Sequence, residues 1–517
     1  MSNPVNLDAL IPREDFEVLT DSSQTNQVEK ISISELEGGK FFYVALRKPD
    51  FQRETSDWSA KKICDFIQSF LDADLIPAVI LWTSGSGNIF VVDGSHRLSA
   101  LIAWVNDDYG DKNISRNFFE ERIPEEQIEA AEKTRKLVRK AVGTYEEHKL
   151  AVNNPEKFKP EVLIRAKRLA TLPLQLQWVK GDASKAEASF FKINQQAAPI
   201  DPTEFKLLKS RKSPNALAAR AIIRSGTGHK YWSKFAADRQ LEIQKIAKAI
   251  NSSLFIPPLK TPIKTLDLPV AGRGYSTQSL PLIFELVNLT NNVVAQKNKS
   301  LAPDVDGQET INYLKCTQRA VDRICGTNPS SLGVHPAVYF YSTTGRYQPT
   351  AFLAVVALIK DLEKADGFKR FTAQRAAFEA FLLKHKNFVN QVTLKFGSGV
   401  KGFAQLKCLY QRLLDLLEAG KNEAEIHEAL EKSAEFSFLQ PAEQEEKTAR
   451  KDFDQETKSA AFLRDALVGA VKCKICGGLI HVKSISIDHK DRKQDGGLGN
   501  VENAQLTHPY CNTTVKQ

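Results

Sequence analysis

The stretch that decides the fold of the C-terminal end is KCKICGGLIHVKSISIDHKDRKQDGGLGNVENAQLTHPYCNTTVKQ, residues 472–517. It opens with Cys473 and Cys476 and closes with a second pair, His508 and Cys511. Two pairs at this spacing supply four ligands for a tetrahedral zinc ion. Because the segment is too short to bury a core of its own, we expect structural zinc to provide its folding free energy. For the third ligand, His481 or a water molecule remains an alternative to His508.

The residues between the two pairs predict a second, catalytic function. VKSISID alternates polar and apolar residues as a half-buried strand does, and it delivers Asp488 and His489 at its end. The glycine-rich DRKQDGGLGN turns the chain back, NAQLTH forms the return strand, and PYCNTTVKQ forms a short helix that carries Asn512. If the three side chains converge, Asp488 and Asn512 offer oxygen ligands to Mg²⁺ or Mn²⁺, and His489 is left as the base that activates water against a phosphodiester.

In the order of these motifs, the last 45 or so residues resemble a zinc-containing HNH endonuclease. The resemblance implies that His489 is the general base, that Asp488 and Asn512 hold the catalytic metal, and that Asn503 supports the loop behind the base. His508 stands where this family usually has cysteine. The chain ends five residues after Asn512, so we expect a helix around residues 460–471 to help hold the unit. The alternative is an inactive zinc module that only binds DNA.

A second constellation is IFVVDGSHRLSALIAWV, residues 89–105, in which a strand ends at Asp93 and a helix begins near Arg97. The helix start favours a phosphate, Gly94 allows close approach of a ligand, and Arg97 can hold phosphate oxygens. Asp93 can bind a metal ion or a ribose hydroxyl. Taken alone, the pattern also fits a structural turn followed by a surface arginine.

The surrounding text resembles the ParB/sulfiredoxin-like domain of GmrSD- and SspE-type modification-dependent nucleases, over roughly residues 35–215. The resemblance rests on PDFQRETSDW, IPAVILW, VVDGSHRLSAL and FFKINQQAAPIDPTEF. It implies binding, and in many members hydrolysis, of a nucleoside triphosphate. The nucleotide-binding residues expected from it are Asp93, Gly94, Arg97, Gln52, Arg53 and Asn194. Ser95 and His96 replace two glutamines of the common form, which leaves the preferred base, and hydrolysis as opposed to binding, open.

The composition of the chain limits its domain number, its partners and its location. The chain has 517 residues, 42% of them hydrophobic, and a formal charge of +9, which suits several domains and permits a nucleic-acid partner. The seven cysteines are an odd and sparse set, and four of them are scattered along the chain, which does not favour disulfides. No apolar run approaches the length of a membrane span and the N-terminus lacks a signal-peptide pattern, so we expect a soluble, cytoplasmic protein.

These observations predict a multi-domain α+β protein. We expect a mixed α/β ParB/sulfiredoxin-like domain over residues 1–235 with a helical insertion at about 106–180, a largely helical middle over 236–450, and a zinc-stapled ββα HNH unit over 451–517. The predicted function is a metal-dependent DNA endonuclease of bacterial anti-phage defence or restriction that is regulated by a nucleotide. Other defence-system subunits are candidate partners. The alternatives are a GmrSD-like modification-dependent restriction enzyme and, from another class, a ParB-like DNA-binding regulator with a non-catalytic zinc module.

Overall fold

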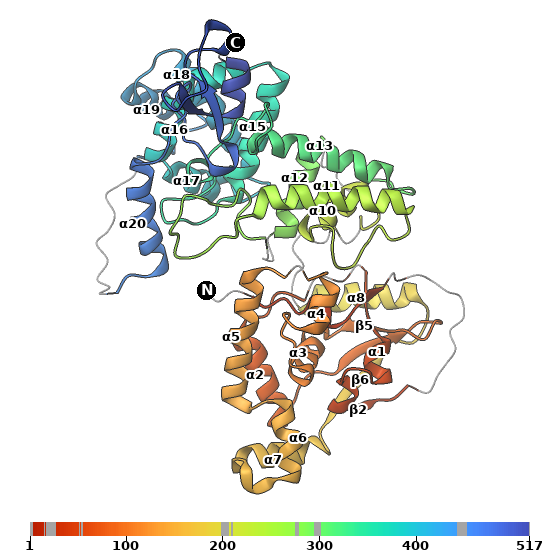
Figure 1. The fold of residues 1–517 in the computed structure, drawn as a ribbon. Helices are drawn as coiled ribbons and strands as arrows, with labels where there is room; N and C mark the ends of the chain where they lie inside the picture. The colour runs from red at the N-terminus through yellow and green to blue at the C-terminus, as the bar shows by residue number, and fades with distance from the viewer. Residues whose placement is uncertain are drawn as a thin grey trace.

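The computed structural model describes residues 4–515 except 15, 17–26, 51, 53–54, 122, 198–205, 208–209, 275–278, 294–300 and 442–451. Figure 1 shows two lobes, an N-terminal lobe built on a sheet and a C-terminal lobe built mainly of helices. No helix in the described ranges combines the length and the apolar character that a bilayer span requires.

The N-terminal lobe is built on a six-stranded mixed sheet with the order β1-β3-β5-β4-β6-β2. Its strands are β1 (Arg13–Glu14), β2 (Lys30–Ser32), β3 (Leu46–Pro49), β4 (Val79–Thr83), β5 (Ile89–Asp93) and β6 (Pro173–Trp178). The pairs β1/β3, β3/β5 and β4/β6 are parallel, and β4/β5 and β2/β6 are antiparallel. β5 is therefore an inner strand, and it ends at Asp93.

Alternation along the inner strands assigns each face of the sheet to a different helical layer. Val91 on β5 belongs to the core shared with α2 and α3, whereas Phe90 and Val92 belong to a smaller cluster with α8. Successive side chains of a strand point to opposite faces, so helices cover both sides. The helices of this lobe are η1 (Asp8–Leu10), η2 (Ile33–Leu36), α1 (Phe41–Ala45), α2 (Ala60–Leu71), α3 (Ser95–Asn106), α4 (Asn113–Phe118), α5 (Glu125–Val142), α6 (Tyr145–Asn153), η3 (Pro155–Lys157), α7 (Pro160–Leu169) and α8 (Ala183–Ala197).

The insertion expected at about residues 106–180 is helical over most of its length, but it ends sooner than expected. After α7 the chain returns as β6, which lies between β4 and β2. The insertion is also not simply a solvated face, because α5 packs on α2 and buries Ala131 and Val138 in the lobe's main core. Glu, Lys and Arg dominate the exposed positions of the insertion. Their number made the buried positions of α5 hard to recognise from the sequence.

The second lobe has a single continuous core that begins earlier than residue 236. Leu207 and all of the hydrophobic residues of α10 belong to it, so packing groups α10 with the helical lobe. Its helices are α10 (Pro214–Ile223), α11 (Ala237–Phe255), α12 (Ser279–Thr290), α13 (Gln308–Ile324), α14 (Pro336–Tyr339), α15 (Pro349–Lys364), α16 (Phe368–Lys384), α17 (Asn387–Phe396), α18 (Phe403–Glu418), α19 (Glu423–Glu431) and α20 (Gln455–Val468).

A buried ion cluster joins the two lobes. Asp8 accepts from Arg13 and Lys48 at 2.7 Å each and from Arg224, which follows α10, at 3.3 Å. Burial alone would raise the pKa of Asp8, but Arg13, Lys48 and Arg224 outweigh it and hold the pKa well below its usual value. Burial also lowers the pKa of Lys48 to about 8 despite its pairing with Asp8. The carboxylate therefore binds three cations from both lobes.

The C-terminal unit consists of a two-stranded antiparallel sheet and short helical turns, docked on the helical lobe. Its elements are η4 (Val482–Ser484), β7 (Ser486–His489), η5 (Lys493–Asp495), β8 (Ala504–Thr507) and the closing turn η6 (Cys511–Val515). Leu479 and Tyr510 belong to the core of the helical lobe. The predicted fold class is confirmed: a mixed α/β domain, a helical middle and a small Cys/His-bearing ββ unit.

Candidate functional site

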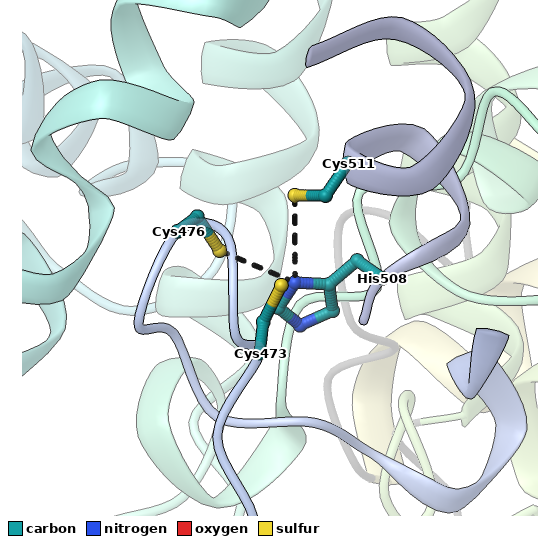
Figure 2. Close-up of side chains that lie close together, drawn as sticks. All are labelled: Cys473, Cys476, His508 and Cys511. Carbon is teal, nitrogen blue, oxygen red and sulfur yellow. Dashed lines mark hydrogen bonds between the residues drawn. The ribbon is translucent and has the colours of Figure 1, made fainter. Parts of the chain in front are cut away.

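The four predicted zinc ligands come together in one buried cluster. Figure 2 shows the sulfurs of Cys473, Cys476 and Cys511 gathered around the ring of His508. The Nδ1 atom of His508 lies 3.3 Å from Cys476 Sγ and 3.9 Å from Cys511 Sγ. Ligands of a tetrahedral zinc ion, bound at about 2.0–2.3 Å, stand at such separations. The residues present therefore fit a structural zinc ion.

The thiol hydrogen bonds of the cluster concentrate negative charge on one cysteine, and they raise the pKa values of Cys476 and Cys511. Hydrogen bonds from the thiols of Cys476 and Cys511 lower the pKa of Cys473, which favours the thiolate that zinc binds. Burial lowers the pKa of His508 and keeps its ring neutral. Its Nε2 lies 3.0 Å from the carbonyl oxygen of Leu479, so Nε2–H donates there and Nδ1 is left for the metal.

His481, the alternative ligand, lies outside this cluster. Its ring is buried against His335, with 5.5 Å between the ring centroids, and burial lowers the pKa of His481 to about 4. It is therefore placed as a neutral core histidine, and the geometry favours His508.

The helical lobe supports the cluster through a buried pair on α16 that the sequence reading missed. Arg375 bonds Glu379 at 2.7 Å, donates to the carbonyls of Leu332 and Gly333, and lies 3.3 Å from His508 Nδ1. Glu379 in turn accepts from the backbone N–H of Leu479 at 2.7 Å. The R-x-x-x-E spacing was visible in the sequence, but it is common on exposed helix faces and gave no sign of burial.

The expected role of the helix at residues 460–471 is taken over largely by other segments. α20 docks on the helical lobe, where Ser459 contacts Ile263 and Glu456 pairs with Arg346. The C-terminal unit is held instead by α16 and by the segment after α13, for example through Tyr510 N–H to Ser331 O at 3.0 Å and Thr513 Oγ1 to Pro329 O at 2.9 Å.

The predicted nuclease residues lie on one edge of the β7–β8 hairpin. Asp488 and His489 end β7, opposite Gln505 and Ala504 of β8. Asp488 is buried and its Oδ2 accepts from the Gln505 side chain at 2.7 Å, whereas His489 is half-exposed. Gln505 is a contact that the motif does not include, and it fixes the carboxylate.

Asn512 is held against the same strand. Its Nδ2 donates to Ser486 Oγ at 2.8 Å and to the carbonyl of Ile487 at 3.3 Å, and its backbone N–H donates to His508 O at 3.0 Å. Because His508 and Cys511 sit in the Cys/His cluster, the cluster sets the position of the Asn512 turn. The amide nitrogen faces β7, which leaves the amide oxygen as the atom suited to a metal ion.

Asn503 contacts the loop that follows His489. Its Oδ1 accepts from Asp491 N–H at 2.7 Å, and its Nδ2 donates to Asp491 O at 3.1 Å and Leu498 O at 2.8 Å. Its backbone carbonyl accepts from Lys490 N–H at 2.7 Å. Asn503 therefore ties both ends of the loop that follows His489.

The second predicted site is an open cavity of about 610 Å³ in the N-terminal lobe. Asp93, Gly94 and Arg97 line it, and so does Gln52. Gly94 has φ +92° and caps α3; a Cβ there would lie 3.1 Å from the Arg97 guanidinium, so the turn requires glycine. The volume falls within the usual range for small-molecule sites.

Arg97 and Asp93 are engaged with each other rather than pointing separately at a ligand. Arg97 Nη2 pairs with Asp93 Oδ2 at 2.6 Å, and Nη1 donates to the carbonyl of Pro77 at 2.5 Å. Gln52 is buried, and its Oε1 has no hydrogen-bond partner in the described part of the chain. A ligand donor would satisfy that oxygen. Arg53 and the side chain of Asn194 lie outside the described residues.

An aromatic wall of this cavity was missed by the sequence reading. His96 stacks on Trp58 with ring centroids 5.7 Å apart and 24° between the planes, and Lys62 Nζ lies 4.8 Å from the Trp58 ring centroid. All three residues line the cavity. Trp58 is the last residue of the PDFQRETSDW motif. Nothing in the sequence placed its side chain beside His96.

Comparison with protein families gives two matches. Residues 473–517 match the HNH endonuclease family, and residues 30–211 match the N-terminal domain of the GmrSD restriction endonuclease. No curated protein and no solved structure matches the chain. The chain thus joins an N-terminal domain that matches the GmrSD N-terminal domain family to a C-terminal domain that matches the HNH endonuclease family.

Proposed function

We propose that this protein is a metal-dependent HNH endonuclease that cuts DNA in bacterial anti-phage defence or restriction, with a nucleotide-binding sensor in its N-terminal lobe. The two matched domains support a restriction-type HNH nuclease. The observation that carries the rest is the hairpin edge, where Asp488 and His489 end β7 and Asn512 is bonded to the same strand.

In the proposed mechanism each side chain has one task. The Asp488 carboxylate and the Asn512 amide oxygen would hold Mg²⁺ or Mn²⁺, an ion that would supply positive charge to stabilise the phosphate oxygens. His489 removes a proton from a water molecule, the water oxygen bonds to phosphorus, and the opposite P–O bond to the sugar oxygen breaks, that oxygen taking a proton from solvent. Asn503 keeps the loop beyond His489 in place, so its role is positioning. The cluster of Cys473, Cys476, His508 and Cys511 holds a structural zinc ion and, through the turn after His508, the position of Asn512.

The proposed substrate is double-stranded DNA, and the surface around this edge suits a nucleic acid. Exposed basic side chains lie in the segment before the hairpin and in the loop that joins its strands: Lys472, Lys474, Lys490, Arg492 and Lys493. Lysine and arginine at such positions bind phosphates without reading sequence. Invading or modified DNA would be met in the cytoplasm, where we expect the protein to act.

The sensor proposal rests on the N-terminal cavity. The N-terminus of α3 and Arg97 suit the phosphates of a nucleotide. The buried Gln52 oxygen can accept a hydrogen bond from the ligand, and its nucleobase can stack on the Trp58–His96 wall. The proposed ligand is a nucleoside triphosphate, and the proposal concerns its binding. Hydrolysis is a separate question, which phosphate release in the presence of the purified protein measures.

Cleavage of supercoiled plasmid by the purified full-length protein, with Mg²⁺ or Mn²⁺, tests the nuclease. We expect His489→Ala to lower the cleavage rate by about 100-fold or more with unchanged zinc content and DNA binding. Glu502→Ala, an exposed change in the same loop, is the matched control and should cut normally. Wild-type cleavage by His489→Ala would remove this residue from the mechanism.

The same assay separates the alternatives. A ParB-like regulator with a non-catalytic zinc module would bind plasmid and leave it intact at every metal concentration. A GmrSD-like modification-dependent enzyme would cut DNA carrying modified bases and spare plain plasmid.

A further inference from the structure

A second group of metal-ligating side chains lies in the helical lobe, far along the chain from the HNH motif. His385 follows α16, and Glu423 and His427 stand one helical turn apart at the start of α19. His385 is buried, His427 is half-buried and Glu423 is exposed. Neither matched family domain includes these residues.

The three donor atoms form a triangle of the size a metal ion needs. His385 Nε2 lies 3.0 Å from Glu423 Oε1 and 3.2 Å from His427 Nε2, and His427 Nε2 lies 3.9 Å from Glu423 Oε1. A point equidistant from these atoms lies about 2.0 Å from each, which is close to the usual length of a Zn–N or Zn–O bond. These separations therefore allow one ion to contact all three atoms.

Hydrogen bonding alone accounts for this arrangement poorly. The Nε2 atom of a neutral imidazole either carries a proton or offers a lone pair. His385 Nε2 can therefore donate to Glu423 or accept from His427, but it cannot do both. A metal ion uses the lone pairs of both imidazoles and the carboxylate oxygen at the same time.

The neighbours of the triangle fit a metal site with one open side. Phe381 and Phe388 flank His385, with ring centroids at 4.4 Å and 5.1 Å, and limit the directions in which its ring can turn. Lys384 bonds the other carboxylate oxygen of Glu423 at 2.7 Å, so Oε1 is the oxygen left for an ion. The exposed side of Glu423 leaves room for water as a further ligand.

We propose that His385, Glu423 and His427 bind a divalent transition-metal ion of the zinc class, which ties the end of α16 to the start of α19. Imidazole with carboxylate suits Zn²⁺, Co²⁺ or Ni²⁺ better than Mg²⁺ or Ca²⁺. Binding through Nε2 puts the proton of His385 on Nδ1, which is buried without a hydrogen-bond partner in the described ranges. We therefore expect binding about 10–100-fold weaker than at a site whose histidines have such partners.

Counting metal ions in the full-length protein tests this proposal separately from the Cys/His cluster. Protein dialysed against micromolar Zn²⁺ should hold one more equivalent in wild type than in His427→Gln or Glu423→Gln. Glu428→Gln is the matched control, because Glu428 is an exposed residue of the same helix but lies outside the triangle; it should bind as wild type does.

Cobalt distinguishes the two sites by their spectra. Wild type with zinc in the Cys/His cluster should take up Co²⁺ with weak visible bands and without the sulfur-to-metal absorption of a thiolate site, and both triangle variants should lose these bands. Equal metal content in wild type, His427→Gln and Glu423→Gln, with no cobalt signal that the substitutions remove, would overturn the proposal whether or not the protein cuts DNA.

Discussion

The Cys/His cluster and the N-terminal cavity differ in how they are assembled. Two short segments, residues 473–476 and 508–511, provide all four donors of the cluster. The cavity takes its walls from at least five segments between Gln52 and Phe190. The first site is determined by local spacing, and the second by the packing of a whole domain. Substitutions should consequently act on the cluster as a unit, but on the cavity in proportion to each residue's own contacts.

The largest effect is expected at the cluster. Cys473→Ser should lose the structural zinc and abolish DNA cleavage, because a unit this small depends on the metal for its folding free energy. Cys408→Ser, at an exposed free cysteine of α18, is the control and should retain both. Metal analysis and plasmid cleavage on the same preparations provide the measurement; a variant at Cys473 with full zinc content would show that the ligand set is wrong.

An intermediate effect is expected between the lobes, where the contacts are non-local but buried. Asp8→Asn leaves Arg13 and Lys48 buried without their carboxylate, and removing one partner of a buried ion pair typically costs about 3–5 kcal/mol. Chemical unfolding should show a lower midpoint for this variant, whereas Asp465→Asn, in an exposed pair with Arg464, should not differ from wild type. An unchanged midpoint for Asp8→Asn would mean that the cluster does not stabilise the lobes.

The pH dependence of the same contact has a defined sign. The pKa of Asp8 is lower in the folded protein than in the unfolded chain. Its stabilising contribution is therefore present above the unfolded pKa of about 4 and is lost as the pH falls through the folded value. Asp8→Asn should remove part of the acid sensitivity of unfolding, and the gap between wild type and variant should narrow as the pH is lowered below about 4.

The contrast also explains what could be predicted from the sequence. Strand, loop and turn in residues 473–515 follow from alternation and ligand spacing, so the positions of Asp488 and Asn512 were predictable, whereas Asn503 was implied only by the resemblance to HNH endonucleases. The strand β6 was not, since its PLQLQW pattern follows a long charged helical stretch and resembles the end of the insertion. The Trp58–His96 wall and the buried Arg375 depend on contacts between distant segments, which leave no periodic signal in the sequence.

The smallest effect, and the one that bears on regulation, is expected at Arg97. The cavity is connected to the helical lobe through a chain of contacts: Arg13 donates to the carbonyl of Gln52, which lines the cavity, and pairs with Asp8, which binds Arg224 beside α10. A nucleotide that binds one arrangement of the lobes more tightly would shift the population of the cutting state.

Arg97→Ala should weaken nucleotide binding and reduce the response of plasmid cleavage to nucleotide, by about 5-fold if the coupling is at the low end of the usual range. Arg97→Lys is the matched control: it keeps the charge but cannot reproduce the forked contacts to Asp93 and Pro77, so it should fall between the two. The measurement is a titration of nucleotide into the cleavage assay with all three proteins. The sign of the response reveals whether nucleotide restrains or licenses cutting. If wild type and Arg97→Ala cut identically at every nucleotide concentration, the N-terminal lobe is a docking scaffold for DNA rather than a switch.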